Sequence, residues 1–337
     1  MPYVLHGAVG HVEIEARGIC HRIEFKVDPI RQVPVINHDR ADSSVNNGTR
    51  ITVHWPKLAC SILAKAKDRF LQIADDYTWL NPHLDLTVEW NGRRQHSQAS
   101  VTAWDKWKPS DPTSPHWYDQ QRFERLIAAY VSHDRGQTRT VREFISEFRG
   151  LSGTAKQAAV LDKIGLARAP LANLCAGGNF DKAKIAKLLA AMQAASKPVK
   201  PKLLGLIGKE HLTQRMAAAG VEMGTFDYLR TFDTTEDGMP CVVEFAFGWC
   251  ENAEGRRLIT GLNWSPGITN PFRQLGSYGQ SLDTILSQQR ADRNEPVILL
   301  LHVACPRVEY TDRGKSAIAI AGEDDDEELD DFPEARE

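Results

Sequence analysis

The chain has 337 residues, a net charge of −3, 42% hydrophobic residues and 25% charged residues, the composition of a globular protein with two or three domains. No apolar run approaches the roughly 20 residues that span a bilayer, and the N-terminus lacks the basic and apolar regions of a secretory signal. We therefore expect a cytoplasmic protein. The six cysteines form no Cys-x-x-Cys pair, which favours reduced thiols over a zinc site.

Charge is distributed unevenly along the chain. Residues 323–337 contain ten acidic residues and one basic residue, which predicts a disordered acidic tail. Residues 139–215 contain fourteen Lys or Arg and five Asp or Glu, a net charge of +9. Such a basic segment indicates either a polyanion partner or an ordinary solvated helix surface, and charge alone favours neither.

Hydrophobic periodicity predicts an alternation of strand-rich and helix-rich segments. In chain order the prediction is strands within 9–55, a helix over 58–79, a strand over 84–90, helices over 122–215, strands over 242–247 and 257–262, a helix over 282–289 and an apolar strand over 296–304. Three prolines between 104 and 118 predict a linker. The strands 242–247 and 257–262 are expected to pair with each other.

Four separated segments carry recognisable motifs. They are Gly-Thr-Arg-Ile-Thr-Val-His-Trp at 48–55, Asn-Pro-His at 81–83, a helical stretch from 139 to 166 that closes with Leu-Ile-Gly-Lys-Glu at 206–210, and Leu-Leu-Leu-His-Val-Ala-Cys-Pro at 299–306 followed by Asp-Arg-Gly-Lys-Ser-Ala-Ile at 312–318. Their order resembles that in the B subunit of topoisomerase VI, a type IIB DNA topoisomerase of the GHKL ATPase group. The resemblance covers approximately residues 10–320.

The resemblance implies an α+β multidomain protein. Its parts would be the C-terminal portion of a GHKL (Bergerat) α/β sandwich at 1–104, a linker at 105–120, an all-helical helix-two-turns-helix domain at 121–211, a βαβ-type transducer domain at 212–322 and the acidic tail at 323–337.

The resemblance also implies roles for single residues. Gly48 and Thr49 match the last ATP-site motif, in which the glycine lets the backbone approach the nucleotide and the Thr hydroxyl bonds near the adenine at the start of a central strand. An ordinary turn is the alternative interpretation. Lys315 matches the switch lysine that reaches the γ-phosphate and couples the ATP state to the domain angle. His302 is expected in the core, and His83 is expected to be an exposed turn residue.

The basic helical segment would contact DNA phosphates without reading sequence. The candidate contacts are Lys156, Lys182, Lys184 and Lys187. The alternative for each of these lysines is a side chain that only faces solvent.

Several motifs of the family are missing from the sequence. The Glu base, the Asn that holds Mg²⁺, the D-x-G-x-G loop and the glycine-rich lid are not found. ATP and Mg²⁺ are the family's cofactors, and we expect no ATP hydrolysis by this chain alone. A gene fragment, a misplaced start codon or one half of a split protein would each account for this pattern. The segment through which the family exchanges N-terminal residues is also missing, so a monomer or weak dimer is expected.

Three functions remain open from the sequence. The first is a topoisomerase VI B-like protein, or a fragment of one, that couples ATP binding to DNA strand passage together with an A-type cleavage subunit. The acidic run after residue 322 stands where the family has a long helix that contacts this subunit, which argues against docking. The second is a non-catalytic DNA-binding scaffold, and the third is a module whose basic face meets another protein.

Overall fold

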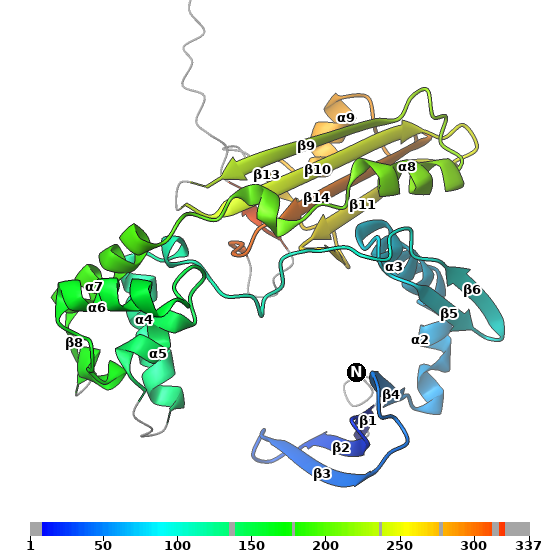
Figure 1. The fold of residues 1–337 in the computed structure, drawn as a ribbon. Coiled ribbons are helices and arrows are strands. Elements are labelled where there is room, and N and C mark those ends of the chain that lie inside the picture. Colours follow the sequence, from blue (N-terminus) through cyan, green and yellow to red (C-terminus); the bar gives the residue numbers. More distant parts are fainter. Residues whose placement is uncertain are drawn as a thin grey trace, which may run out of the picture. The chain divides into compact units, whose positions relative to one another are not determined.

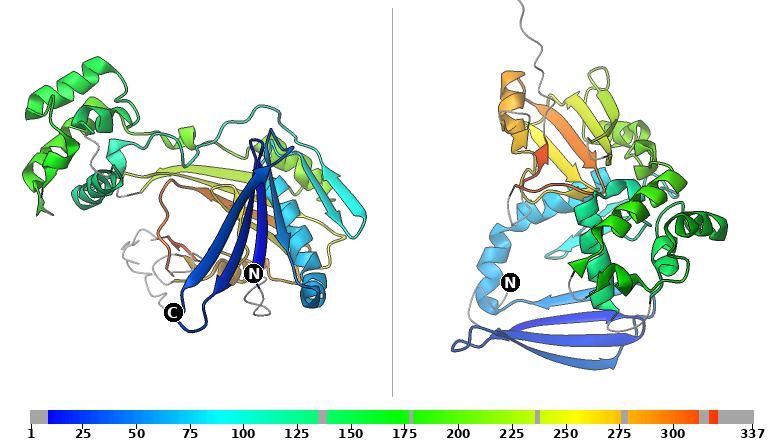
Figure 2. Two further views of the ribbon diagram at one scale, coloured as in Figure 1. Left: turned by 90° about the horizontal axis from the view of Figure 1, so that it is seen from below. Right: turned by 90° about the vertical axis from the view of Figure 1, so that its left-hand side faces the viewer.

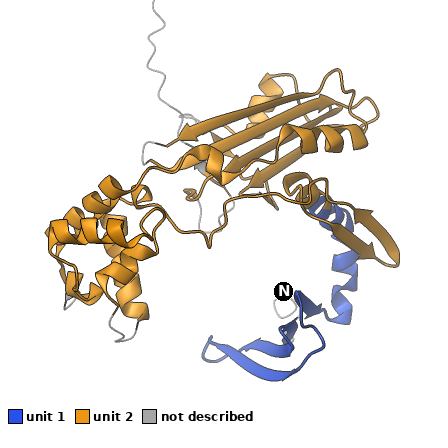
Figure 3. Cartoon of the chain, viewed as in Figure 1, with its two compact units in different colours: residues 1–74 blue, residues 75–337 orange. Residues whose placement is uncertain are grey.

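The computed structural model describes residues 9–134, 139–176, 179–235, 238–275, 279–311 and 317–320. These residues form several sheets and helices, which confirms the predicted α+β class (Figure 1). The chain divides into two compact units, unit 1 at residues 1–74 and unit 2 at residues 75–337 (Figure 3). The boundary lies inside one helix, α3 (Lys67–Leu80). The domain boundaries expected at 104, 120, 211 and 322 stay predictions.

Unit 1 contains a four-stranded antiparallel sheet. Its strands are β1 (Gly10–Ala16), β2 (Ile19–Val27), β3 (Pro34–Asp42) and β4 (Thr49–His54), in the order β3-β2-β1-β4. The register places Val12 beside both Ile23 and Val53, and places Glu13 beside Arg22 on the next pair. Since neighbouring residues of a strand point to opposite faces, one face of this sheet is apolar and the other is charged.

A helical stretch follows β4, with one interruption. It consists of η1 (Lys57–Ala59), α2 (Cys60–Lys65) and α3, so the single helix predicted over 58–79 is broken at Ala66. The helix ends at Leu80, as Asn81–Pro82 predicts. The strands β5 (Leu86–Trp90) and β6 (Arg93–Ser97) then pair as a hairpin, whose turn residues Asn91 and Gly92 have φ of 48° and 76°. These left-handed conformations are the ones that a two-residue hairpin turn requires.

The segment 115–195 is mainly helical. Its elements are η2 (Pro115–Trp117), α4 (Gln120–His133), α5 (Val141–Ser146), α6 (Thr154–Ile164), η3 (Leu171–Leu174), the short paired strands β7 (Cys175–Ala176) and β8 (Asn179–Phe180), and α7 (Lys182–Ala195). Thr140 and Glu143 form a capping box that starts α5, and Gly165 ends α6 at a φ of 68°. The helices enclose a core that includes Phe123, Phe144 and Leu188.

A five-stranded mixed sheet forms the centre of the remaining chain. Its strands are β9 (Asp227–Thr234), β10 (Pro240–Trp249), β11 (Arg257–Leu262), β12 (Ser265–Pro266) and β14 (Val297–Ala304), in the order β12-β11-β14-β10-β9. The strand β14 therefore separates β10 from β11, and the prediction that 242–247 pairs with 257–262 is wrong. The apolar run takes the central place because both of its faces can be covered there. A second, small sheet pairs β13 (Gln274–Leu275) with β15 (Ala319–Ile320).

Helices cover both faces of this mixed sheet (Figure 2). One face packs on α8 (Lys209–Ala218) and the end of α3, and the short helix η4 (Pro201–Leu204) precedes α8. The opposite face packs on α9 (Leu282–Gln288). Because β11 and β14 are parallel and α9 lies between them in the chain, they form the βαβ unit that the resemblance implies. Within the described ranges, no helix has the length and apolar character of a membrane span.

Candidate functional site

Two ionisable side chains face each other inside the mixed sheet. Glu244 on β10 is the register partner of His302 on β14, and both residues are 0% exposed. Nδ1 of His302 lies 3.2 Å from Oε2 of Glu244, while the backbone N–H of Trp264 donates to Nε2 at 3.2 Å. Because Nε2 accepts a hydrogen bond, the proton of this neutral imidazole is on Nδ1, which donates to the carboxylate. The predicted core position of His302 is confirmed.

The carboxylate of Glu244 has four donors. Besides His302, it accepts the backbone N–H groups of Ile207 at 2.8 Å and Gly208 at 2.9 Å, and the hydroxyl of Tyr228 at 2.7 Å. Burial by itself raises the pKa of Glu244, but the bonds from His302, Gly208 and Ile207 hold that pKa below its usual value. A positive φ of 91° at Gly208 belongs to the same turn. The Leu-Ile-Gly-Lys-Glu motif is therefore fixed to the sheet by one buried anion.

The Asn-Pro-His turn joins the same network from the other side. Nδ2 of Asn81 donates to the carbonyl of Trp264 at 2.8 Å, and its Oδ1 accepts from Nζ of Lys106 at 3.1 Å. A Cβ added at Gly261 would lie 2.6 Å from the Leu80 side chain, so the end of α3 packs directly on β11.

One continuous hydrogen-bonded path thus connects three of the four motifs. It runs from Asn81 through Trp264, His302 and Glu244 to Gly208. All of these residues belong to unit 2. We call this path the buried polar chain. The sequence shows the motifs themselves. It does not show that they contact one another, because these hydrogen bonds join residues far apart in the chain.

A second polar cluster anchors α3 to the elements around it. Oδ1 of Asp75 accepts from Arg215 on α8 at 2.8 Å, and its Oδ2 accepts from Arg257 on β11 at 2.6 Å. Arg257 also donates to Asp76 at 2.9 Å, and both guanidinium groups lie over the ring of Trp79. Burial raises the pKa of Asp75, but the two arginines more than offset this effect and lower it.

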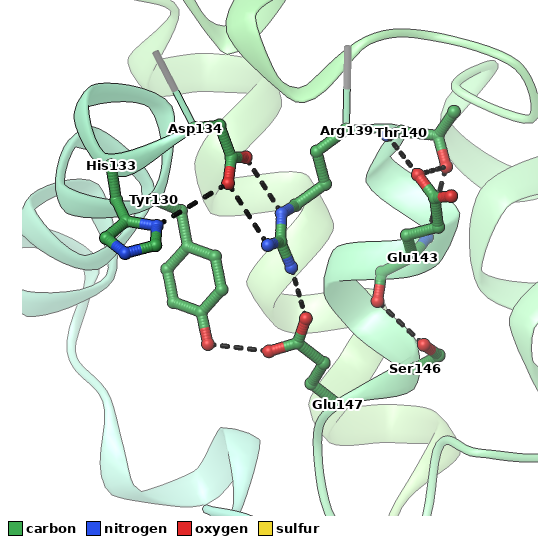
Figure 4. A network of polar contacts seen from close by, with 8 residues as sticks. All are labelled: Tyr130, His133, Asp134, Arg139, Thr140, Glu143, Ser146 and Glu147. Atoms are coloured by element: carbon green, nitrogen blue, oxygen red, sulfur yellow. Dashed lines mark hydrogen bonds and ion pairs between the residues drawn. The ribbon is translucent and has the colours of Figure 1, made fainter. Parts of the chain in front are cut away.

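Ion pairs and hydrogen bonds connect the start of the basic segment to the end of α4 (Figure 4). Arg139 donates to Asp134 from Nε at 2.8 Å, and it also pairs with Glu147, which accepts the hydroxyl of Tyr130 at 2.7 Å. Burial and Glu147 raise the pKa of Tyr130 to about 12. The hydrogen bonds from Arg139 lower the pKa of Asp134. Arg139 is therefore committed to intramolecular contacts and adds little to a basic surface.

The four candidate DNA-contacting lysines differ in their surroundings. Nζ of Lys156 donates to the carbonyl of Gly150 at 3.0 Å, and Nζ of Lys184 pairs with Asp181 at 2.8 Å. Lys182 and Lys187 on α7 are exposed, and neither ammonium group has a partner in the part of the chain that the structure describes. Lys182 and Lys187 are thus the two whose ammonium groups make no hydrogen bond or ion pair in that part of the chain, although the charge of Lys187 helps to lower the pKa of Asp181.

The predicted nucleotide residues lie in unit 1. Gly48 has a φ of 78°, and a Cβ added there would meet nothing within 4 Å. Thr49 begins β4, which was expected to be a central strand. In the described four-stranded sheet β4 is instead an edge strand. His83 is exposed, as predicted, and stacks on Trp104 at a centroid distance of 4.9 Å.

Lys315 lies outside the described residues. The described residues on either side of its segment pair with each other: Tyr310 bridges Ile318, and the N–H of Thr311 donates to the carbonyl of Ala317 at 3.0 Å. The role of Lys315 at the γ-phosphate stays a prediction.

One cavity was missed by the sequence analysis. It has a volume of about 410 Å³ and is lined by Lys106, Lys108, Trp264 and Arg307, among others. The segment 104–118 was interpreted as a linker only. The alternation of tryptophan and lysine in Trp-Asp-Lys-Trp-Lys at 104–108 was the readable signal.

The chain was compared with known proteins. No protein-family model matches it, and no curated protein matches it. Among solved structures it is similar to the B subunit of DNA gyrase from Myxococcus xanthus, with 11% identity over 93% of this chain and 62% of that chain and a TM-score of 0.33. It is also similar to the ATP-binding domain of topoisomerase IV from Francisella tularensis, with 9% identity over 94% of this chain and 59% of that chain and a TM-score of 0.31. The chain therefore spans about three fifths of the length of these structures, and similarity at this level assigns no function.

Proposed function

We propose that this chain acts on DNA as a B-subunit-like part of a type IIB topoisomerase. In this proposal the helical segment 115–195, which contains α7, holds duplex DNA. The five-stranded mixed sheet transmits conformational changes between α3 and this helical segment. ATP, Mg²⁺ and an A-type cleavage subunit would complete the activity.

The observation that carries the proposal is the buried polar chain. The resemblance rests on motifs far apart in the sequence, and three of them meet through Asn81, His302 and Glu244. Hydrogen bonds are strong in a low-dielectric interior, so this path favours one arrangement of the elements that it connects. The helix α3 begins in unit 1 and ends at this network, so it is the element that would carry a change from one unit to the other.

DNA binding is the first test. Fluorescence anisotropy with a labelled duplex should show binding that weakens steeply with salt, because phosphate contacts release counterions. Replacing Lys182 and Lys187 together by Glu should reduce the slope of log affinity against log salt by about 2. The matched control is the double change Lys202→Glu and Lys209→Glu, which alters the charge equally outside α7. No duplex binding at low salt, or an equal loss in both double variants, contradicts the proposal.

Coupling to ATP is the second test. A non-hydrolysable ATP analogue with Mg²⁺ should change the affinity for duplex DNA, and Lys315→Ala should abolish this effect. Asn81→Ala should weaken the effect without removing basal DNA binding, because it opens the buried polar chain, to which no residue of α7 belongs.

A DNA-binding scaffold that does not use ATP is the second candidate. The edge position of β4 favours it, because a nucleotide at Gly48 and Thr49 would meet an edge strand rather than the middle of a sheet. Salt-sensitive duplex binding that the ATP analogue leaves unchanged would support the scaffold over the topoisomerase-like function.

A further inference from the structure

The cavity of about 410 Å³ opens between the segment after β6 and the segment after β14. Its walls include Lys106, Trp107, Lys108, Trp264, Arg307 and Tyr310. No Asp or Glu is among its described lining residues. A volume of this size falls in the range of small-molecule sites, which is roughly 300–1,000 Å³.

Two of the lining cations have no carboxylate partner within the described ranges. Nζ of Lys106 donates to the neutral Oδ1 of Asn81 and lies 5.0 Å from the ring centroid of Trp264. The nearby Asp111 accepts the backbone N–H of Lys108 rather than its ammonium group. Burial and the charge of Lys108 lower the pKa of Lys106. The exposed His83 stacks on Trp104, and this partial desolvation together with Lys106 and Lys108 lowers its pKa. The charges of Lys106 and Lys108 therefore lie close together without a carboxylate partner among the described residues.

The walls of the cavity are held in place by contacts of their own. Gly205 approaches the linker so closely that an added Cβ would lie 2.7 Å from the carbonyl oxygen of Asp105. Asn263 and Trp264 form the turn between β11 and β12, with φ of 49° and 63°. A two-residue hairpin turn requires left-handed residues, and the bulky Trp264 adopts this conformation at a cost in strain. Asn263 is fixed by two side-chain bonds to the backbone of Cys305, both 2.9 Å long.

Two polar groups of the tryptophans that line the cavity are unsatisfied within the described ranges. The indole N–H groups of Trp107 and Trp264 are buried, and neither has an acceptor among the described residues.

We propose that this cavity binds a phosphate group between Lys106 and Lys108. A phosphate carries up to two negative charges and several acceptor oxygens, so it can pair with two ammonium groups at once. The indole rings of Trp107 and Trp264 supply the apolar wall. The phosphate comes either from a free nucleotide or from a DNA backbone. Nothing in this inference requires the proposed function, because the residues that line the cavity include none of α7 and neither Gly48 nor Thr49.

Pyrophosphate titration is the direct test, with His83 as the reporter. Proton NMR of the full chain should show the pKa of His83 rising when pyrophosphate binds, because the anion offsets the charges of Lys106 and Lys108. The His83 resonance is assigned by its loss in His83→Gln. Lys108→Gln should weaken pyrophosphate binding about tenfold, since one charge-assisted hydrogen bond is removed. Lys163→Gln on α6 is the matched control and should bind as the unaltered chain does.

Two outcomes overturn the inference. One is a His83 resonance whose titration does not change in pyrophosphate, and the other is equal binding by Lys108→Gln and Lys163→Gln. Because Lys108 is exposed, its substitution leaves the fold intact. Lys106→Gln provides a second variant that still donates to Asn81 and should lose affinity similarly.

The source of the phosphate is resolved by two competitors. ADP that displaces pyrophosphate at equal phosphate concentration, where a short duplex does not, assigns the cavity to a nucleotide. Displacement by the duplex and not by ADP assigns it to the DNA backbone. A chain that binds pyrophosphate but no duplex would retain this inference while the proposed function fails.

Discussion

The carboxylate of Glu244 and the imidazole of His302 lie face to face across β10 and β14, with 3.2 Å between Oε2 and Nδ1. Neither side chain is exposed. Both residues stand in strands that otherwise carry apolar side chains on this face, so the pair interrupts the core at its middle. Two strands, the turn before α8 and the turn after β11 all depend on it.

Glu244→Gln should destabilise the protein by about 3 kcal/mol, because the amide group presents N–H to donors that need an acceptor. Urea denaturation followed by tryptophan fluorescence measures the change. Glu222→Gln is the matched control, since Glu222 is exposed, and should change stability by less than about 0.5 kcal/mol. Equal stability of the two variants would show that the carboxylate of Glu244 is dispensable.

Acid should destabilise unit 2 through His211 on α8. Burial lowers the pKa of His211 to about 4, and its ring lies between Ser100 and the carbonyl of Trp79. Between this pKa and the unfolded value near 6.5, the unfolded chain binds the proton and the folded chain does not. Stability contributed by neutral His211 is therefore present above about pH 6.5 and is lost as the pH falls towards 4, by up to about 3 kcal/mol.

The measurement is the free energy of unfolding between pH 4 and pH 7.5, compared with that of His211→Gln. The variant should be less stable at pH 7 and should show a flatter pH dependence. Parallel curves for the two proteins would mean that other groups cause the acid sensitivity.

Asp75→Ala should cost about 2 kcal/mol of stability, because Arg215 and Arg257 lose their shared anion while Arg257 keeps Asp76. The value is set below that of a fully buried pair because the side chain of Asp75 is 27% exposed. Asp68→Ala, in the first turn of the same helix, is the control and should cost no more than about 1 kcal/mol. Thermal unfolding by circular dichroism separates the two variants.

Gly205→Ala should destabilise the chain by about 2 kcal/mol or more, because φ is 96° and the new Cβ would lie 2.9 Å from Cα of Lys106. Gly224→Ala has open space and no positive φ, so it should be nearly neutral. The same Gly205 variant should also weaken pyrophosphate binding, since it displaces the wall that carries Lys106. Unchanged stability would mean that the linker does not rest on Gly205.

Local features of the sequence predicted most of the individual elements. The period-two pattern of Val12 and Ile14, the turn at Asn91 and Gly92, and the helix stop before Pro82 all depend on neighbours in the chain, and the structure confirms them. The predicted pairing of strands was wrong. The partner of β11 is β14, because this apolar strand takes the central place where both of its faces are covered.

The site was less predictable than the fold. His302 was recognised as a core residue, but its partner Glu244 lies 58 residues away and no local pattern connects them. Nothing in the sequence indicated a binding role for Lys106 other than its position between two tryptophans. Its significance comes from neighbours in three separate segments, at Asn81, Trp264 and Arg307.

The apolar face of the sheet in unit 1 has a consequence for experiments in solution. Ile36 is 59% exposed, Ile51 is 64% exposed and Val53 is 40% exposed, and all three belong to this face by register. Exposed apolar surface of this kind binds environment-sensitive dyes and promotes concentration-dependent association. Light scattering should therefore rise with protein concentration and fall when a mild detergent is added. Affinities for DNA and pyrophosphate should therefore be measured at protein concentrations at which light scattering shows no association.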